Sequence, residues 1–358
     1  MPISAVDSVS PAFEHTKQQL FRPFRFGQWT RLALVGLFAG EMSSGGGCNF
    51  NSFNVPTHTG TTHHDFLLAA HPNWALLAPL IIAALIALPV VWLVLIYVNS
   101  RMRFVLFDSV IAKRCEFLRM WRQWRGPAFQ YFVWQIVLAL IAIAGIAVLV
   151  GVPVLGAFLL GWITAPREHL AGLILGGVFL FFVVMVWGFL FLLLNVFTKD
   201  FVVPQMALEN ISAFEGWRRL WEMLKAEKGS YAGYGGMKIL LAIAAAFGVG
   251  ILAFIAIIAL LIPFGGFGAI AVIAGKAGGL TWNVFTITAA VVVGSIFLAC
   301  VMYVVSLISV PVIVFFPAYS IYFFAARYPR LGALIYPSPP VEPAPPAPMV
   351  PPAPEPMG

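Results

Sequence analysis

Four long stretches without an Asp, Glu, Lys, Arg or His constrain this sequence more than any other feature. They run approximately over residues 74–98, 128–160, 171–197 and 239–262. A helix of roughly 20 apolar residues crosses a hydrocarbon core about 30 Å thick, so each stretch is long enough to span a membrane. The sequence therefore predicts an integral membrane protein.

Two further stretches complete the predicted set of spans. From Thr286 to Phe324 the apolar pattern exceeds one membrane thickness, so we expect a helix that is tilted or broken at Pro311 and continues into the cytoplasmic interface. Residues 29–42 form a shorter run that contains Arg31 and leads into a Gly- and Ser-rich segment, so they form either a full span or a half-span. Counting them as a span, we predict an all-α, polytopic membrane protein with six transmembrane helices.

The distribution of Lys and Arg predicts the orientation. Of the 21 basic residues, 19 lie in the N-terminal segment, between spans two and three, between spans four and five, or near the C-terminus. Only Arg167 and Lys276 lie in the opposite loops. Because basic flanks stay in the cytoplasm, we expect a multi-pass protein of the bacterial inner (plasma) membrane with both termini cytoplasmic. The net charge of +7 then reflects topology, and we expect no nucleic-acid partner.

An internal repeat organises the chain. Residues 103–124 align without gaps on residues 200–221, and partial third copies occur near both ends of the membrane domain. The aligned pairs are Phe104 with Phe201, Val105 with Val202, Phe117 with Phe214, Arg122 with Arg219 and Trp124 with Trp221. We predict three parallel two-span repeats, approximately 8–102, 103–199 and 200–328, each beginning with a cytoplasmic amphipathic helix. Parallel repeats differ from the inverted repeats of many alternating-access transporters.

The domain organisation follows from these repeats. Residues 1–336 form the predicted six-span membrane domain, and residues 337–358 form a tail in which 11 of the 22 residues are Pro. Proline at this density prevents helix and sheet, so we predict a disordered cytoplasmic tail.

The predicted interfacial helices carry the candidate contact residues. Ser212 and Glu215 fit a capping box at the start of one such helix. Aromatic and basic side chains then recur on opposite faces, as expected of a helix at a membrane surface. Contact with lipid and contact with a protein partner are both open. The candidate residues are Phe214, Trp217, Arg218, Arg219 and Trp221, with Phe117, Trp121 and Trp124 in the preceding repeat.

The segment from Asp200 to Trp221 has an aromatic and valine run, Pro204, Glu209 and then Ala213-Phe214-Glu215 before a basic helix. In this it resembles the bacterial six-helix proteins related to the glycerophosphoryl diester phosphodiesterase membrane domain. The resemblance implies an integral membrane domain whose own molecular role is poorly defined. Such domains are often fused to a phosphodiesterase barrel, for which this chain has no room, so the resemblance carries no esterase activity over to it.

The predicted external loop between spans one and two contains the only candidates for metal ligands. Imidazole and carboxylate groups bind zinc or copper, but these residues lack the spacing of a helical or CxxC-type site. An ordinary polar loop is the alternative, and we expect neither a bound metal nor another cofactor. The weak candidates are His58, His63, His64, Asp65 and His71.

The apolar stretches offer no catalytic set. Gln135 and Asn195 are the main polar residues within them, and we expect both to form hydrogen bonds between helices. Asp108 and Asp200, at the cytoplasmic ends of spans, are expected to pair with bases or cap amides. We therefore expect no enzyme, but a non-enzymatic membrane scaffold or accessory protein with membrane lipids, and a membrane or cytoplasmic protein, as partners. A permease or lipid-handling channel, with its path along the pseudo-axis of the repeats, is the alternative.

Overall fold

The computed structural model describes residues 4–41, 74–162, 167–279 and 284–336. Most of these residues are helical, and none of them forms a strand. Five of its helices are long and apolar enough to cross a membrane: Leu85–Ile111, Arg125–Leu159, Leu170–Glu209, Lys228–Gly275 and Phe285–Ala325. The prediction of an all-α membrane protein is confirmed at this level.

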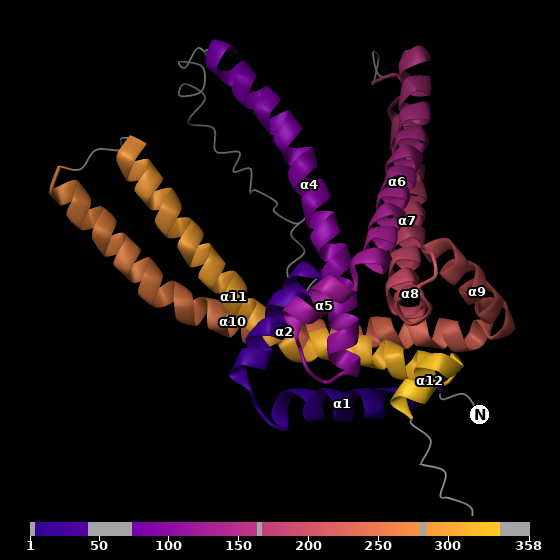
Figure 1. The fold of residues 1–358 in the computed structure, drawn as a ribbon. Helices are drawn as coiled ribbons and strands as arrows, with labels where there is room; N and C mark the ends of the chain where they lie inside the picture. Colours follow the sequence, from indigo (N-terminus) through magenta and orange to yellow (C-terminus); the bar gives the residue numbers. More distant parts are fainter. Residues whose placement is uncertain (1–3, 42–73, 163–166, 280–283, 337–358) are drawn as a thin grey trace, which may run out of the picture.

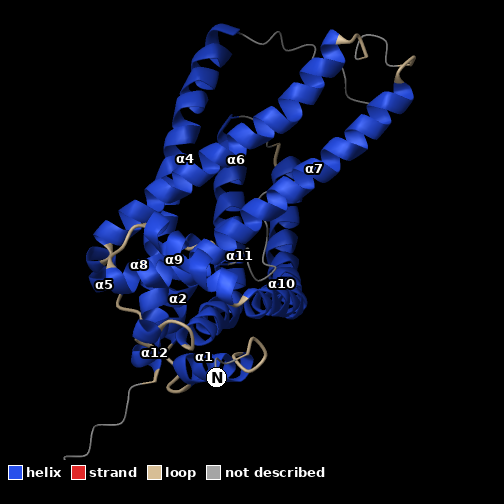
Figure 2. Ribbon diagram, turned by 90° about the vertical axis from the view of Figure 1, so that its right-hand side faces the viewer, coloured by secondary structure: helices blue, strands red, loops and turns tan. Residues whose placement is uncertain are grey.

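The long helices form three arms that spread away from a common base (Figures 1 and 2). One arm is α4 (Trp74–Ile111), the second pairs α6 (Arg125–Leu159) with α7 (Leu170–Phe197), and the third pairs α10 (Lys228–Ala277) with α11 (Val284–Ala325). The 50 residues of α10 measure about 75 Å at 1.5 Å per residue, so only part of this helix fits a hydrocarbon core. The basal ends of the long helices form part of the base.

Short helices complete the base. Both described ends of the chain lie there, because the first and last of these helices pack against the basal end of α11. The short helices are α1 (Val9–Phe21), α2 (Phe26–Phe38), α5 (Phe117–Gln123), the π-helix η3 (Thr198–Val202), α8 (Val203–Glu209), α9 (Ala213–Ala226) and α12 (Pro329–Ile335).

The structure does not confirm a span at residues 29–42. Helix α2 has 13 residues, about 20 Å of helix, which is shorter than a hydrocarbon core. It runs antiparallel to the basal end of α4, because Asn99 Nδ2 donates to the Phe38 carbonyl (3.0 Å) and Gln28 Nε2 donates to the Lys113 carbonyl (3.0 Å). Residues 29–41 therefore lie in the base, and the segment that joins them to α4 lies outside the described residues.

Helix α11 is not broken at Pro311. The helix continues through both Pro311 and Pro317, and it bends as it enters the base (Figure 1). A proline removes one backbone hydrogen bond and favours a kink, which the packing of the surrounding base accommodates. Of the two expected alternatives, the break at Pro311 is wrong, because the helix is continuous, and the tilt stays a prediction.

The buried core lies in the base. Its largest side chains are aromatic and come from η3, α4, α10 and α11, whereas α7 has no buried residue. The segments that the repeat alignment makes equivalent pack together there, because α11 contacts both α4 and η3, and α4 contacts α8. The fully buried aromatic side chains are Phe104, Phe201, Phe316, Phe323, Phe324, Tyr231, Tyr234 and Tyr319.

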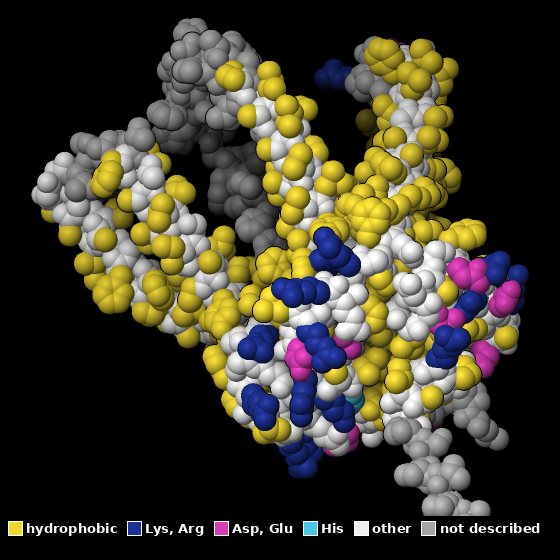
Figure 3. All heavy atoms as spheres, in the orientation of Figure 1, with side chains coloured by type: hydrophobic (Ala, Val, Ile, Leu, Met, Phe, Trp, Pro, Cys, Tyr) yellow, Lys and Arg dark blue, Asp and Glu magenta, His cyan; other side chains and the backbone are white. Residues whose placement is uncertain are grey.

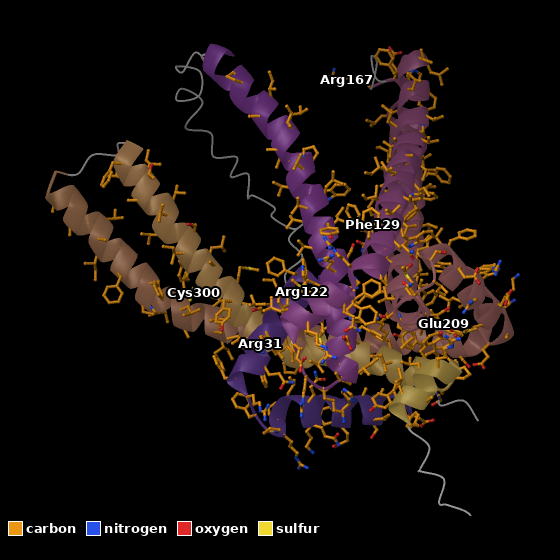
Figure 4. The ribbon with its side chains drawn as sticks, viewed as in Figure 1. Arg31, Arg122, Phe129, Arg167, Glu209 and Cys300 are labelled. Carbon is orange, nitrogen blue, oxygen red and sulfur yellow. The ribbon has the colours of Figure 1, made fainter. Side chains whose placement is uncertain are left out.

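Most charged side chains lie in the base, and few lie on the arms. Lys, Arg, Asp and Glu gather below the apolar arms in Figure 3. Arg31 and Arg122 lie in the base, while Arg167 lies at the far tip of the α6–α7 arm (Figure 4).

Candidate functional site

A group of buried charged residues lies where the arms join the base. The cluster, called here the ion cluster, brings together α4, η3, α10 and the residues that follow α2. Its members are Glu41, Arg103, Lys199, Asp200 and Lys238.

Ion pairs run through this cluster. Glu41 accepts from Arg103 Nη1 at 3.3 Å and also pairs with Lys199. Asp200 pairs with Lys238 and accepts a hydrogen bond from the Tyr234 hydroxyl at 2.9 Å. Because the side chains of both acids are at most 3% exposed, these pairs are shielded from water. The expected pairing of Asp200 with a base is confirmed.

Local backbone geometry positions the two acids. In the π-helix η3, every residue but Lys199 is buried, and the adjacent Lys199 and Asp200 both form ion pairs in the cluster. Before Glu41, Gly40 adopts a φ of +71°, and a Cβ there would lie 3.0 Å from Asn99 Nδ2. Glycine therefore suits the turn that brings Glu41 to its partners.

The electrostatics of the cluster favour an ionised Glu41. Burial raises the pKa of this carboxyl, but the positive charges of Lys199 and Arg103 outweigh burial and hold the pKa below its ordinary value. A space of about 30 Å³ remains among the charged side chains, comparable to the volume of about one water molecule. The ion pairs can hold these four segments of the chain together. In the described residues, no three His, Cys, Asp or Glu side chains lie close enough together to hold a metal.

Helix α9 places its predicted contact residues on two sides. Leu220 is fully buried, and Trp217 packs against the core with its indole Nε1 donating to Thr198 Oγ1 at 2.9 Å. Phe214 and Trp221 are 72% and 56% exposed, so they lie on the uncovered side of α9. Ser212 Oγ accepts from the Glu215 amide at 3.3 Å, which confirms the serine half of the capping box.

The two predicted arginines of α9 are engaged in ion pairs. Arg218 and Arg219 donate to Glu215 at 2.9 and 3.1 Å. Arg219 also lies 2.7 Å from Glu209, whose carboxylate binds Tyr328 as well. These contacts fix α9 to α8 and to the segment before α12.

The predicted contact residues around α5 pack inward instead. Phe117 stacks on Trp121 with ring centroids 5.7 Å apart, and the Arg101 guanidinium lies 4.7 Å from the Trp121 ring centre. Trp124 stacks on Phe104 and donates from Nε1 to Asp108 at 3.1 Å. These three aromatic residues therefore stabilise the base, and Asp108 pairs with an indole.

The polar residues within the arms behave differently from each other. Gln135 accepts from Ser100 Oγ at 2.8 Å, which confirms a hydrogen bond between α6 and α4. Asn195 donates to the Phe191 carbonyl of its own helix at 2.9 Å, so the expected bond between helices is not seen for this residue. His58, His63, His64, Asp65 and His71 lie outside the described residues.

Two of the grooves in the described part of the chain contact long helices outside the ion cluster. One, of about 480 Å³, lies between α10 and α11 and is lined almost entirely by apolar residues and glycines, among them Phe264, Gly268 and Phe297. The other, of about 600 Å³, lies between α2, α4 and α5 and has arginines at its rim. Both have the size of small-molecule sites.

Sequence reasoning missed the partners of the cluster. Lys199 and Asp200 were visible as adjacent opposite charges at the end of an apolar run, and Glu41 as an acid at the end of another. Such positions indicate a pairing requirement, because a charge at the edge of a hydrocarbon region is costly without a partner. The spacing along the chain gives no means of choosing Glu41 and Lys238 as those partners.

Fold and site together define an all-helical membrane protein with apolar arms on an ion-paired base. The chain belongs to the DUF7544 family, a family of unknown function, whose model matches residues 3–334. No curated protein and no solved structure matches the chain.

Proposed function

We propose that this protein is a non-enzymatic membrane scaffold, in which apolar arms anchor a rigid cytoplasmic base that contacts lipid or a protein partner. The observation that carries the proposal is the contrast in burial: α7 has no buried residue, whereas the base holds an aromatic core and shielded ion pairs. A base built in this way holds its surface helices in fixed positions. The proposal includes cytoplasmic termini and a bacterial inner membrane.

The three-repeat architecture is part of the same proposal. This proposal is supported by contacts between segments that the repeat alignment makes equivalent. In the base, α11 contacts α4 and η3, and α4 contacts α8. In each predicted repeat a short helix precedes the long ones: α1, α5 and α9. Parallel repeats would place these short helices on the same side of the membrane, as a scaffold requires. The resemblance to the glycerophosphoryl diester phosphodiesterase membrane domain stays a prediction, and it concerns only this membrane architecture.

The exposed aromatic residues of α9 provide the test. Replacing both Phe214 and Trp221 with Ser should remove a bound partner while leaving the fold intact, because neither side chain is buried. The measurement is native mass spectrometry of the protein released from nanodiscs made from its own membrane. Phe13→Ser, at a residue 59% exposed on α1, is the matched control.

The scaffold proposal fails if the double variant retains the same proteins and lipids in the same stoichiometry as the parent chain. Trp217 is unsuitable for this test, because its contacts with Thr198 and the core make loss of fold the expected result of substitution.

Lipid handling is the second candidate function, and the apolar groove between α10 and α11 favours it. The predicted path along the pseudo-axis of the repeats belongs to this candidate. The ion cluster does not supply such a path, since the space among its side chains is only about 30 Å³. Reconstituted vesicles with a fluorescent lipid in one leaflet would test this candidate. Transfer between leaflets no faster than in protein-free vesicles would exclude it.

A further inference from the structure

The groove between α2, α4 and α5, called here the basal groove, has the polarity gradient of a phospholipid. Along α2 the lining passes from Phe38 and Leu34 to Arg31, and α5 adds both apolar side chains and Arg119. The lining residues are Arg31, Leu34, Val35, Phe38, Met102, Glu116, Phe117, Leu118 and Arg119.

The apolar end of the basal groove lies level with the end of an apolar run. Val35 and Met102 are buried beneath the groove, and Leu34 and Phe38 are 46% and 43% exposed along its wall. The Phe38 carbonyl accepts from Asn99, the residue that follows the apolar stretch 74–98 of α4. This end therefore meets the edge of the hydrocarbon region.

The basic end lies deeper in the base. Arg31 Nη1 donates to the Cys115 carbonyl at 3.5 Å, which fixes the guanidinium at the rim. Arg119 lies across the groove, 3.4 Å from Glu116, and its side chain is 76% exposed. Two guanidinium groups against one carboxylate leave the rim with a net positive charge.

The length of the groove agrees with this gradient. From Phe38 to Arg31, α2 rises about 10 Å at 1.5 Å per residue. The headgroup region of one leaflet is about 5–7 Å thick, and arginine side chains extend further, so both guanidinium groups can reach the phosphate level. A wholly apolar occupant would leave the basic rim unused, and a free anion would leave the apolar wall uncovered.

We propose that the basal groove binds one anionic glycerophospholipid, with its phosphate at Arg31 and Arg119 and an acyl chain along Leu34, Phe38 and Leu118. This inference rests on the proposed scaffold function, whose lipid contact it specifies. Guanidinium groups bind phosphate through charge-assisted hydrogen bonds, and basic pockets on the cytoplasmic side of membrane helices recognise anionic headgroups. The bound lipid would join α2 and α5 across α4.

The test uses the full chain in nanodiscs of equal parts phosphatidylglycerol and phosphatidylcholine. Native mass spectrometry counts the lipids that remain bound after release. The parent chain should retain one phosphatidylglycerol, and the variant with both Arg31→Gln and Arg119→Gln should retain it about tenfold less, the effect of losing one charge-assisted hydrogen bond or more. Retention of phosphatidylcholine should be the same in both.

Arg330→Gln is the matched control, because Arg330 is also an exposed arginine that lies 3.4 Å from a glutamate, and it is outside the basal groove. A second variant, Leu34→Trp, fills the apolar wall without changing charge and should also displace the lipid. Its control is Leu334→Trp, at a residue 53% exposed outside the basal groove.

Three outcomes would overturn the inference: equal retention of both lipids by the parent chain, retention by the double variant at the parent level, or an equal loss in Arg330→Gln. Thermal unfolding in detergent identifies any variant that fails to fold, and Leu34→Trp then provides the decisive comparison. The scaffold proposal is judged separately by the Phe214 and Trp221 variant, so failure of one is distinguishable from failure of the other.

Discussion

The arms and the base of this protein bury their side chains to opposite extents. In α7 no residue is buried, and large apolar side chains such as Phe179 and Leu175 are each 71% exposed. In the base, Phe201 and Tyr234 are fully buried and the ion cluster is shielded. Lipid tails are as apolar as the arms, so they give the arms no hydrophobic reason to pack on one another. The base must therefore hold the relative positions of the arms.

The two helices within one arm do pack on each other, although lipid gives them no hydrophobic reason to do so. The Trp187 ring of α7 packs directly on Gly145 of α6, where an added Cβ would lie 2.1 Å from the ring. Small residues that permit close approach are what membrane helices use in place of hydrophobic burial. Pairing within an arm and assembly of the three arms thus depend on different forces.

The largest expected difference between the two regions comes from removing one phenylalanine ring from each. Phe201→Ala should lower the free energy of unfolding by about 4 kcal/mol, because the ring contacts Tyr231, Tyr234, Phe323 and Phe324. Phe179→Ala, in the arm, should change it by less than about 1 kcal/mol. Unfolding in mixed detergent micelles, followed by circular dichroism, measures both. Equal effects would contradict the division into arms and base.

The ion cluster is expected to give the next largest effect. Asp200→Asn leaves the ammonium group of Lys238 buried without its countercharge, which should cost about 3 kcal/mol. Adding Lys238→Met to this variant should recover part of the loss, since the second substitution removes the unpaired charge. The same detergent titration measures both variants. No recovery in the double variant would show that the pair does not carry the stability assigned to it.

The sequence predicted the arms better than it predicted the base. The apolar runs at 128–160 and 171–197 match α6 and α7 within three residues at each end, because a hydrocarbon environment requires both length and freedom from charge. Residues 29–42 were predicted to span, although α2 packs beside the basal end of α4. A short apolar helix can lie either in the hydrocarbon core or in the packed base, so hydropathy alone does not distinguish a span from a buried helix.

The predicted contact residues of α9 also show what the sequence alone does not decide. Trp217 and Trp221 belong to one amphipathic helix, yet the first donates to Thr198 and packs on the core while the second is 56% exposed. Helical spacing identifies an apolar face and does not say which part of that face another helix will cover. The partner of Asp200 was equally hidden, because Lys238 is 38 residues away along the chain. Only tertiary packing brings such groups together.

The cap of α9 gives a smaller effect that is confined to the base. Ser212→Ala removes the hydroxyl that accepts from the Glu215 amide and should lower the free energy of unfolding by about 1 kcal/mol. Ser212→Asp, which restores an acceptor, should recover it. Ser295 provides the control in an arm, since its hydroxyl donates to the Val292 carbonyl of the same helix, and Ser295→Ala should have little effect. A larger loss at Ser295 than at Ser212 would reverse the expected ranking.

The smallest expected effect is a change in pH dependence that originates in the base. His15 lies among α1, α4 and α11, with Nε2 at 2.9 Å from the Val110 carbonyl and Nδ1 at 3.2 Å from the Tyr322 hydroxyl. Burial lowers the pKa of His15 below 6.5, and the nearby charge of Lys113 lowers it further, while hydrogen bonds to Val110 and Gln19 oppose this. The neutral ring, with its proton on Nε2, satisfies both contacts.

A folded-state pKa below the unfolded value means that the unfolded chain binds the proton more readily. The contribution of His15 to stability is therefore complete above pH 6.5 and is lost as the pH falls from 6.5 towards the folded-state pKa. His15→Gln should lower stability slightly at pH 8 and flatten its decline between pH 7 and pH 5, as measured by thermal unfolding in detergent at each pH. His169→Gln, at the residue that precedes α7, should leave that slope unchanged, because this imidazole stacks on Trp162 in the connection between α6 and α7. If His169→Gln flattened the slope instead, the pH response would arise in an arm, and the base would not be the only region whose packing controls stability.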